Sequence, residues 1–451
     1  MNLKRLTSTF VAGVLAVTLP FTQAQARTSD IKHANEISLA AKLATPVMTA
    51  EQVHKTYIKI ALEGFQLDES GPRIPANIAI VLDKSGSMQG EKIARARDAA
   101  IMAIERLNSD DIVSVVSYDS RVQVVVPATK VSDKHQIAEA IRGIYANGNT
   151  ALFAGVSKGA KELRKFLDLN KVNRVILLSD GLANVGPSTP NELGDLGRSL
   201  AKEGMSVTTI GLGLGYNEDL MTKLAGYSDG NHAFVENASD LARIFQYEFG
   251  DVLSVVAQGV HIEIQCKNGV KPLRILGRDA QIRGNRITTR MNQLYSEQEK
   301  FLILEVEVPA KSVQNDLELA KVDVRYTNLY NEQEQQLNRA VLANFSRSEL
   351  EVQTAVDVKT YEAAVEQVAN EESQKAIELR DQGDIEGAKS VLKQNAIYLD
   401  TLGQQLSSPK LLEQKAEALQ DATELERDED WNKTRKQLKE RQYKRATQQT
   451  Y

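Results

Sequence analysis

Five side chains that carry oxygen donors are the residues most able to do chemistry in this chain. They are Asp83, Ser85, Ser87, Thr150 and Asp180. The first three share the segment 83–87, in which a tight turn at Gly86 would gather one carboxylate and two hydroxyls around a single point. Because every donor is an oxygen, the set favours Mg²⁺, Mn²⁺ or Ca²⁺ over zinc or copper, which prefer nitrogen and sulfur. The sequence therefore predicts a metal site and assigns no catalytic residue.

These donors are far apart in sequence, and residues 77–252 show a pattern that can bring them together. Short β-rich apolar runs alternate there with helical patterns, which is typical of a parallel sheet with crossover helices. The runs are 78–82, 112–118, 122–126, 175–178, 207–212 and 232–235. Only three residues separate the second run from the third, so the third is predicted to be an antiparallel edge strand. We expect an α/β, doubly wound domain with a mostly parallel six-stranded sheet and helices on both faces.

The candidate donors stand where strands of this predicted sheet end. Asp83 ends the first run, Asp180 follows the fourth, and Thr150 precedes a helical pattern. If the strand order is 3-2-1-4-5-6, the first and fourth strands are neighbours, so Asp83 faces Asp180 across the crevice and Thr150 closes the ring from above. Open α/β sheets bind ligands in that crevice, beyond the carboxyl ends of the strands.

The Asp-x-Ser-x-Ser segment, the distant Thr150 and the Asp180-Gly181 pair resemble the metal-ion-dependent adhesion site of a von Willebrand factor type A (VWA) domain. The resemblance covers about residues 77–250. It implies that Ser85, Ser87 and Thr150 ligate Mg²⁺ directly or nearly so. It also implies that Asp83 and Asp180 bind the ion directly or through water. The implied function is adhesion-like and not enzymatic, with an Asp or Glu of a protein partner completing the coordination shell.

The regions that flank the predicted VWA domain, residues 73–252, have different patterns. Residues 56–62 alternate like a half-buried strand, and 253–346 carry strand patterns separated by turns. Because the lone early strand has no partner of its own, we predict that 56–72 and 253–346 form one β-sandwich into which the α/β domain is inserted. This plan is similar to bacterial secreted proteins labelled calcium-activated chloride channel homologues and, more distantly, to inter-α-trypsin inhibitor heavy chains.

The last part of the chain, residues 349–451, is rich in Glu, Gln, Lys, Ala and Leu and predicts a C-terminal α-helical region. Breaks at Gly383-Asp384 and Ser407-Ser408-Pro409 divide it into three helices, with Asp384 as a cap. Residues 432–451 carry seven Lys or Arg against one Glu. We interpret this basic tail as a solvated helix end or a frayed terminus, in preference to a site for an anionic partner.

Composition and the first residues bear on where the protein works. The 451 residues carry 55 Lys and Arg against 60 Asp and Glu, which excludes a chain held on nucleic acid by its charge. Basic residues, an apolar run at 10–19 and Ala24-Gln25-Ala26 predict a cleaved signal peptide, 1–26, and residues 27–55 then resemble a linker. No later segment is apolar enough to span a bilayer, so we expect a periplasmic or secreted protein.

Other interpretations of the sequence stay open beside a metal-dependent adhesion protein. The glycines of Gly211-x-Gly213-x-Gly215 suggest a dinucleotide loop, but their spacing is not G-x-G-x-x-G, so close packing of the loop is preferred. A Mg²⁺-dependent hydrolase would use Asp83 or Asp180 as a base to an ion-bound water. An envelope scaffold would act through its C-terminal helices. Cys266, the single cysteine, is interpreted as a buried structural thiol.

Overall fold

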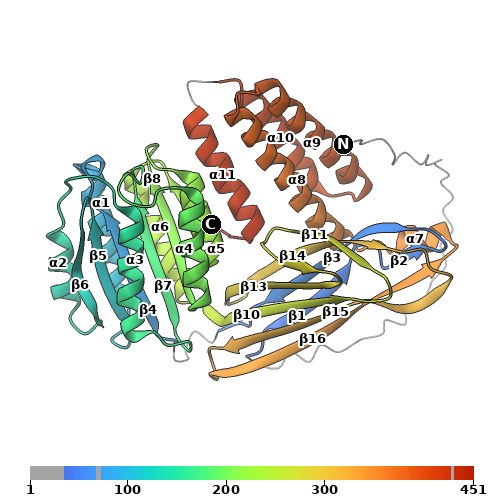
Figure 1. Cartoon of the computed structure of the whole chain (residues 1–451), viewed down its shortest axis with the longest axis horizontal. Coiled ribbons are helices and arrows are strands. Elements are labelled where there is room, and N and C mark those ends of the chain that lie inside the picture. Colours follow the sequence, from blue (N-terminus) through green and yellow to red (C-terminus); the bar gives the residue numbers. More distant parts are fainter. Residues whose placement is uncertain (1–34, 68–72, 428–430) are drawn as a thin grey trace. The chain divides into compact units, whose positions relative to one another are not determined.

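The computed structural model describes residues 35–67, 73–427 and 431–451. The predicted signal peptide, 1–26, and the first part of the predicted linker lie outside the described residues. The described part contains an α/β domain, two packed β-sheets and a set of C-terminal helices (Figure 1). None of the helices in these ranges has both the length and the apolar character needed to cross a membrane.

The α/β domain is built on a six-stranded sheet with the order β6-β5-β4-β7-β8-β9. Its strands are β4 (Ala76–Asp83), β5 (Ile112–Tyr118), β6 (Val122–Lys130), β7 (Val172–Ser179), β8 (Met205–Leu212) and β9 (His232–Val235). All neighbours pair in parallel except β5 and β6, which are antiparallel. Counted along the chain, the order is 3-2-1-4-5-6, so the predicted sheet is confirmed and β4 lies beside β7.

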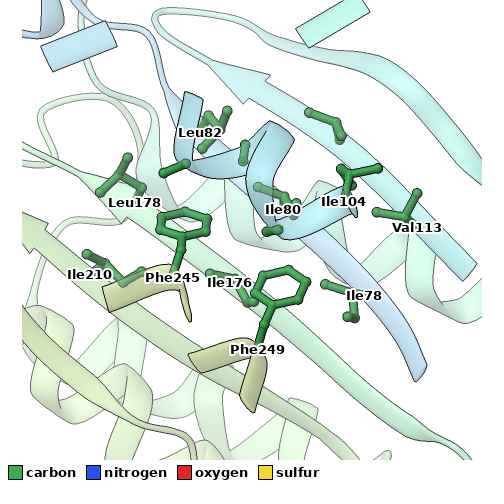
Figure 2. Close-up of a cluster of buried hydrophobic side chains, with 14 of the residues drawn as sticks. Ile78, Ile80, Leu82, Ile104, Val113, Ile176, Leu178, Ile210, Phe245 and Phe249 are labelled. Carbon is green, nitrogen blue, oxygen red and sulfur yellow. The ribbon is translucent and has the colours of Figure 1, made fainter. Parts of the chain in front are cut away.

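Helices cover both faces of this sheet because successive strand residues point to opposite sides. On one face, Ile78 and Ile80 of β4 are buried with Phe249 of α6 (Figure 2). Helices α1 and α2 add side chains to the same cluster. On the other face, Ala79 and Val81 of the same strand are buried under α3, α4 and α5. The helices are α1 (Glu91–Glu105), α2 (Lys134–Arg142), α3 (Leu152–Leu163), α4 (Pro190–Lys202), α5 (Glu218–Ser228) and α6 (Leu241–Val252), with short 3₁₀ turns η1 (Gly86–Met88), η2 (Arg164–Phe166) and η3 (Ala238–Asp240).

The β-sandwich consists of two sheets that enclose a separate hydrophobic core. One sheet has the order β1-β3-β14-β11, with β1 (Ser38–Leu43), β3 (His54–Glu63), β14 (Glu299–Val308) and β11 (Lys271–Leu276). The other has the order β12-β13-β10-β15-β16-β2, with β12 (Gln281–Arg283), β13 (Arg286–Tyr295), β10 (Val255–Cys266), β15 (Gln314–Asn328), β16 (Gln333–Ser346) and β2 (Val47–Thr49). Because β3 precedes the α/β domain and pairs with β14, which follows it, the α/β domain is an insertion in the all-β sandwich.

The expected linker, 27–55, is wrong for residues 38–49, which form β1 and β2. Strand β1 pairs with β3, and β2 pairs in parallel with the end of β16, where Phe345 faces Met48. Both Met48 and Phe345 are buried in the core of the sandwich. A partner almost 300 residues away supplies this pairing, so no local pattern at 47–49 indicates it.

The C-terminal region is helical as expected, but its described residues, 349–427 and 431–451, form five helices where the sequence indicates three. They are α7 (Glu349–Thr354), α8 (Val358–Asp381), α9 (Ile385–Gln405), α10 (Pro409–Glu424) and α11 (Trp431–Thr447). The two predicted breaks are confirmed, because Asp384 caps α9 by accepting from the N–H of Gly387 at 2.9 Å, and Ser408 caps α10.

Helix α11 lies against the outer edge of the α/β sheet. Glu440 accepts a hydrogen bond from the backbone N–H of Phe234 in β9 at 3.1 Å, which satisfies a donor at the sheet edge. Arg435 pairs with Asp219 of α5 at 2.6 Å and with Asp381 of α8 at 2.7 Å. The interpretation of the basic tail as a solvated or frayed end is therefore wrong, because its cations meet carboxylates that lie far away in the sequence.

Lys436 is the most deeply buried cation of α11, and its loss should destabilise the packing of this helix. Its Nζ donates to the carbonyl of Tyr216 at 2.9 Å and to Glu218 at 2.6 Å, and its side chain is 2% exposed. We expect Lys436→Met to lower the free energy of unfolding by about 2–3 kcal/mol, since it leaves a buried carboxylate with fewer donors. Chemical denaturation measures this change. Lys444→Met is the control, because Lys444 pairs with Glu440 nearer the surface and should cost under about 0.5 kcal/mol; equal costs would contradict the assignment.

Cys266 ends β10 and is 1% exposed, as expected for a structural thiol. Burial raises the pKa of the thiol to about 11, so the reactive thiolate is scarce at neutral pH. We expect no reaction of the native protein with an aromatic disulfide reagent, and labelling of one thiol per chain after denaturation. Rapid labelling of the native protein would show that β10 opens locally.

Candidate metal centre

Asp83 is the last residue of β4 and lies at the carboxyl edge of the sheet. Its side chain is completely buried, and each carboxylate oxygen accepts one hydrogen bond. Oδ1 accepts from the backbone N–H of Ser85 at 2.8 Å, and Oδ2 accepts from the hydroxyl of Ser179 at 2.6 Å. These bonds hold the carboxylate in one orientation and bend the chain sharply after the strand, as an Asx turn does.

The two serines of the turn point toward the neighbouring strand. Ser85 Oγ and Ser87 Oγ are 3.1 Å apart, and the Ser87 hydroxyl donates to Asp180 Oδ1 at 2.6 Å. Asp180 directly follows β7, and its carboxylate is completely buried. The predicted juxtaposition of the β4 and β7 ends thus brings the two serines and Asp180 into one hydrogen-bonded group.

Thr150 comes from a third loop, which backbone hydrogen bonds join to the first. The N–H of Gly86 donates to the carbonyl of Gly148 at 2.9 Å, and the N–H of Asn147 donates to the carbonyl of Lys84 at 2.6 Å. Asn184 also accepts from the N–H of Thr150 at 2.9 Å, which links this loop to the one after β7.

The position of Gly181 shows how closely the hydroxyls converge. A Cβ atom on this glycine would lie 3.2 Å from Thr150 Oγ1, 3.4 Å from Ser87 Oγ and 3.9 Å from Ser85 Oγ. The three hydroxyls therefore border one small volume, and the residue that follows Asp180 has no side chain to fill it. We refer to these three hydroxyls and the carboxylates of Asp83 and Asp180 as the oxygen ring.

The chemistry of the oxygen ring fits a hard divalent cation. Burial raises the pKa of Asp83, and the nearby charge of Asp180 raises it further, because two carboxylates repel each other in a site of low polarity. A cation between them would relieve this cost. Among the described residues, no group of three or more His, Cys, Asp or Glu side chains is placed to hold a metal ion, so this candidate site depends on its hydroxyls together with two carboxylates. Hydroxyls together with two carboxylates favour Mg²⁺, Mn²⁺ or Ca²⁺.

Three residues that the sequence analysis did not single out contact the oxygen ring or its loops. Ser179 orients Asp83, Asn184 orients Thr150, and Lys92 Nζ lies 2.6 Å from Asp180 Oδ2. Ser179 directly precedes Asp180 at the end of a predicted strand, so its position in the sequence could have indicated a contact with the site. Lys92 lies on α1, and no spacing rule connects it to Asp180.

Gly211 and Gly215 allow close packing of the loop after β8, as the sequence interpretation preferred, whereas a Cβ at Gly213 would meet only ordinary contacts with Lys92. A Cβ at Gly211 would lie about 2.1 Å from the ring of Tyr216, and one at Gly215 would lie 2.6 Å from the carbonyl oxygen of Asp180. The loop after β8 therefore packs directly against the backbone of Asp180, which belongs to the oxygen ring.

Gly215→Ala should consequently weaken the metal site without altering any donor. The added methyl must push against the Asp180 carbonyl, and we expect the affinity for Mg²⁺ or Mn²⁺ to fall by about tenfold. Calorimetric titration measures the affinity. Gly250→Ala in α6 is the matched control, because nothing lies within 4 Å of its added Cβ, and it should bind metal like the wild type. Unchanged affinity in Gly215→Ala would show that this contact does not position Asp180.

Comparison with known proteins identifies the family to which the α/β domain is similar. The family model for the von Willebrand factor type A domain matches residues 77–247. An uncharacterised protein of Synechocystis is 27% identical over 346 residues, which are 72% of this chain and 79% of that protein. The uncharacterised protein YfbK of Escherichia coli is 26% identical over 201 residues, and human inter-alpha-trypsin inhibitor heavy chain H3 is 24% identical over 200 residues. The matched parts span only 35% and 22% of those two relatives.

Solved structures show the same fold. A von Willebrand factor type A protein from Catenulispora acidiphila has a TM-score of 0.66 at 16% identity, covering 84% of this chain and 89% of that one. The ArnB paralog VWA2 from Sulfolobus acidocaldarius has a TM-score of 0.61 at 15% identity, covering 91% and 98%. With the strand order, the helices on both faces and the family match in agreement, residues 77–247 form a VWA domain, and the chain is a VWA-domain protein.

Proposed function

We propose that this protein is an interaction protein that captures an Asp or Glu side chain of a protein partner. A divalent cation bound at the oxygen ring, preferably Mg²⁺, would hold that side chain. The single observation that carries the proposal is the convergence of three hydroxyls beside two buried carboxylates at the edge where β4 and β7 end. A VWA domain suggests protein interaction in general, and the ring specifies how that interaction would be made.

Charge explains why such a ring suits capture of an acid. Asp83 and Asp180 supply at most two negative charges, and the remaining donors are neutral hydroxyls. Few anionic donors leave a bound dication with a strong attraction for a further carboxylate, which can replace one of its waters. Such a contact is stronger than an exposed ion pair, which is worth about 0–1 kcal/mol. One acidic side chain could therefore anchor the partner.

The exposed apolar residues beside the ring would add selectivity. Leu182 follows Gly181 and is 58% exposed, and Leu214 precedes Gly215 and is 42% exposed. Both therefore flank Asp180, at the edge where the partner's carboxylate would arrive. The proposal also includes export to the periplasm or the cell exterior, which the signal-peptide pattern of residues 1–26 supports.

A hydrolase remains the second candidate, and it fits the ring less well. Among the described residues, the side chains of Asp83, Ser85, Ser87 and Asp180 form hydrogen bonds with hydroxyls, with a backbone N–H and with Lys92, and none of these partners is a histidine. Mg²⁺-dependent turnover of phosphoester or peptide substrates that disappears in Asp83→Asn would establish hydrolysis. Absence of turnover over a broad substrate panel would reject it.

The proposed function is tested by crosslinked capture from an envelope extract. The wild-type chain and Ser85→Ala are compared with Mg²⁺ and with EDTA. We expect defined partners to be captured only by the wild-type chain in the presence of Mg²⁺. Free glutamate-rich peptide should reduce this capture. Capture that survives both EDTA and Ser85→Ala would reject the oxygen ring as the binding site and favour a scaffold acting through the C-terminal helices.

A further inference from the structure

Lys92 is a cation built into the wall of the oxygen ring. Its Nζ lies 2.6 Å from Asp180 Oδ2, while Asp180 Oδ1 accepts from the Ser87 hydroxyl. The carboxylate of Asp180 is completely buried, whereas the Lys92 side chain is 36% exposed. Asp180 is thus shared between the hydroxyls of the ring and a fixed positive charge.

The place of Lys92 on its helix is unfavourable by itself. It is the second residue of α1, which begins at Glu91. The first turn of a helix carries a partial positive charge, so acidic residues are favoured there and a lysine is not. The contact with Asp180 compensates for this position, which points to a role at the ring rather than in the helix.

Other charges near the ring are already neutralised. Lys84, inside the Asp83–Ser87 turn, forms an ion pair with Asp119. Arg95, one turn along α1 from Lys92, pairs with Glu91 at 3.3 Å on the surface. Within the described ranges, Lys92 is the cation that forms an ion pair with a ring carboxylate.

A simple charge count shows what this lysine does to the ring. The carboxylates of Asp83 and Asp180 contribute −2, and Lys92 reduces the total to −1. When a divalent cation is bound, the net charge of the site is +1, whereas it would be zero without Lys92. The lysine therefore repels the metal ion and, once the ion is bound, adds attraction for an incoming carboxylate.

We propose that Lys92 tunes the ring toward carboxylate capture, lowering its affinity for the divalent cation and raising the affinity of the loaded site for an acidic ligand. This inference rests on the proposed function. It makes a prediction that a purely structural ion pair does not make, because neutralising Lys92 must change the two affinities in opposite directions.

The test uses the full chain with Mn²⁺ as the metal probe and acetate as the carboxylate probe. Free Mn²⁺ is followed by its paramagnetic resonance signal, and acetate binding by the loss of water-proton relaxation at saturating Mn²⁺. We expect Lys92→Gln to bind Mn²⁺ at least about tenfold more tightly, and to bind acetate several-fold more weakly. Arg95→Gln, which removes one charge from the same helix without touching the ring, should stay within about twofold of wild type in both measurements. Lys92→Arg keeps the charge and should resemble the wild type.

The outcomes separate this inference from the proposed function. If wild type binds no Mn²⁺ at a site that Ser85→Ala removes, the proposed function fails. If wild type binds Mn²⁺ but Lys92→Gln binds it equally or more weakly, or both affinities fall together, the tuning role is overturned and the function stands. Lys92→Met replaces Lys92→Gln if the latter does not fold, and failure of both neutral variants to fold would assign the pair a structural role and overturn the inference.

Discussion

Replacing Ser85 with alanine is expected to lower the affinity for Mg²⁺ or Mn²⁺ by at least about a hundredfold and to abolish metal-dependent partner capture. The substitution removes a hydroxyl that lies 3.1 Å from Ser87 Oγ and borders the volume beside Gly181. It keeps the backbone N–H that donates to Asp83 at 2.8 Å, so the turn after β4 retains its shape. We therefore expect a loss of about 1 kcal/mol or less in the free energy of unfolding without metal.

Calorimetric titration and thermal unfolding of the same samples separate binding from folding. Ser109→Ala is the matched control, because Ser109 is exposed in the turn before β5, at the opposite edge of the sheet. The control should bind metal like wild type. Metal affinity that Ser85→Ala leaves unchanged would remove Ser85 from the ligand set, and loss of the fold would show that the serine is structural.

Replacing Arg174 with methionine should give the largest loss of stability, because this arginine joins the VWA domain to the β-sandwich. Arg174 belongs to β7 and its side chain is completely buried. It donates to Gln293 and, at 2.5 Å, to the hydroxyl of Tyr295, both on β13, and its Nη1 lies 3.7 Å from Glu248 of α6. Removing one partner of a buried ion pair costs about 3–5 kcal/mol, since the other charge stays buried without compensation.

The cost of Arg174→Met should depend on pH through Glu248. Burial raises the pKa of Glu248 to about 7, although Arg174 acts in the opposite direction. Because its pKa is raised in the native state, Glu248 stays protonated there at pH values at which it is already ionised in the unfolded chain. The contribution of this protonation to stability is therefore lost as the pH rises from the ordinary range of a glutamate pKa toward 7. Without Arg174 the pKa of Glu248 should rise further. The substitution should therefore cost about 3–5 kcal/mol at pH 8 and clearly less at pH 5.

Chemical denaturation at the two pH values measures this difference. In the double variant Arg174→Met/Glu248→Gln no buried charge is left at this pair, so the pH dependence should disappear and part of the stability should return. A cost of Arg174→Met that is the same at pH 5 and pH 8 would show that Glu248 is not its energetic partner.

Local patterns were sufficient to predict the six-stranded α/β sheet and the edge at which the candidate site residues meet. The apolar run of β4, which buries Ile80 on one face of the sheet and Val81 on the other, is visible in the sequence, and Asp83 directly ends that strand. Parallel strands bring their carboxyl ends to one edge, so Asp180 could be placed beside Asp83 from strand order alone.

The features that local patterns do not indicate depend on contacts between segments that are distant in the sequence. Strand β2 is three residues long and pairs with β16, so its own residues carry no recognisable period. The basic composition of α11 suggests solvation, but Arg435 and Lys436 meet acids of α5 that are more than 200 residues away. Lys92 looks like any helix surface lysine until the fold brings Asp180 to it.

We propose above that five side chains from three loops hold one divalent cation. Anomalous diffraction from crystals of the full chain grown with Mn²⁺ tests it most directly. We expect one strong peak within about 2.0–2.3 Å of the Ser85 and Ser87 hydroxyl oxygens, beside Thr150 and Asp180, and no such peak in Ser85→Ala. A peak elsewhere, or none at the ring at saturating Mn²⁺, would contradict it.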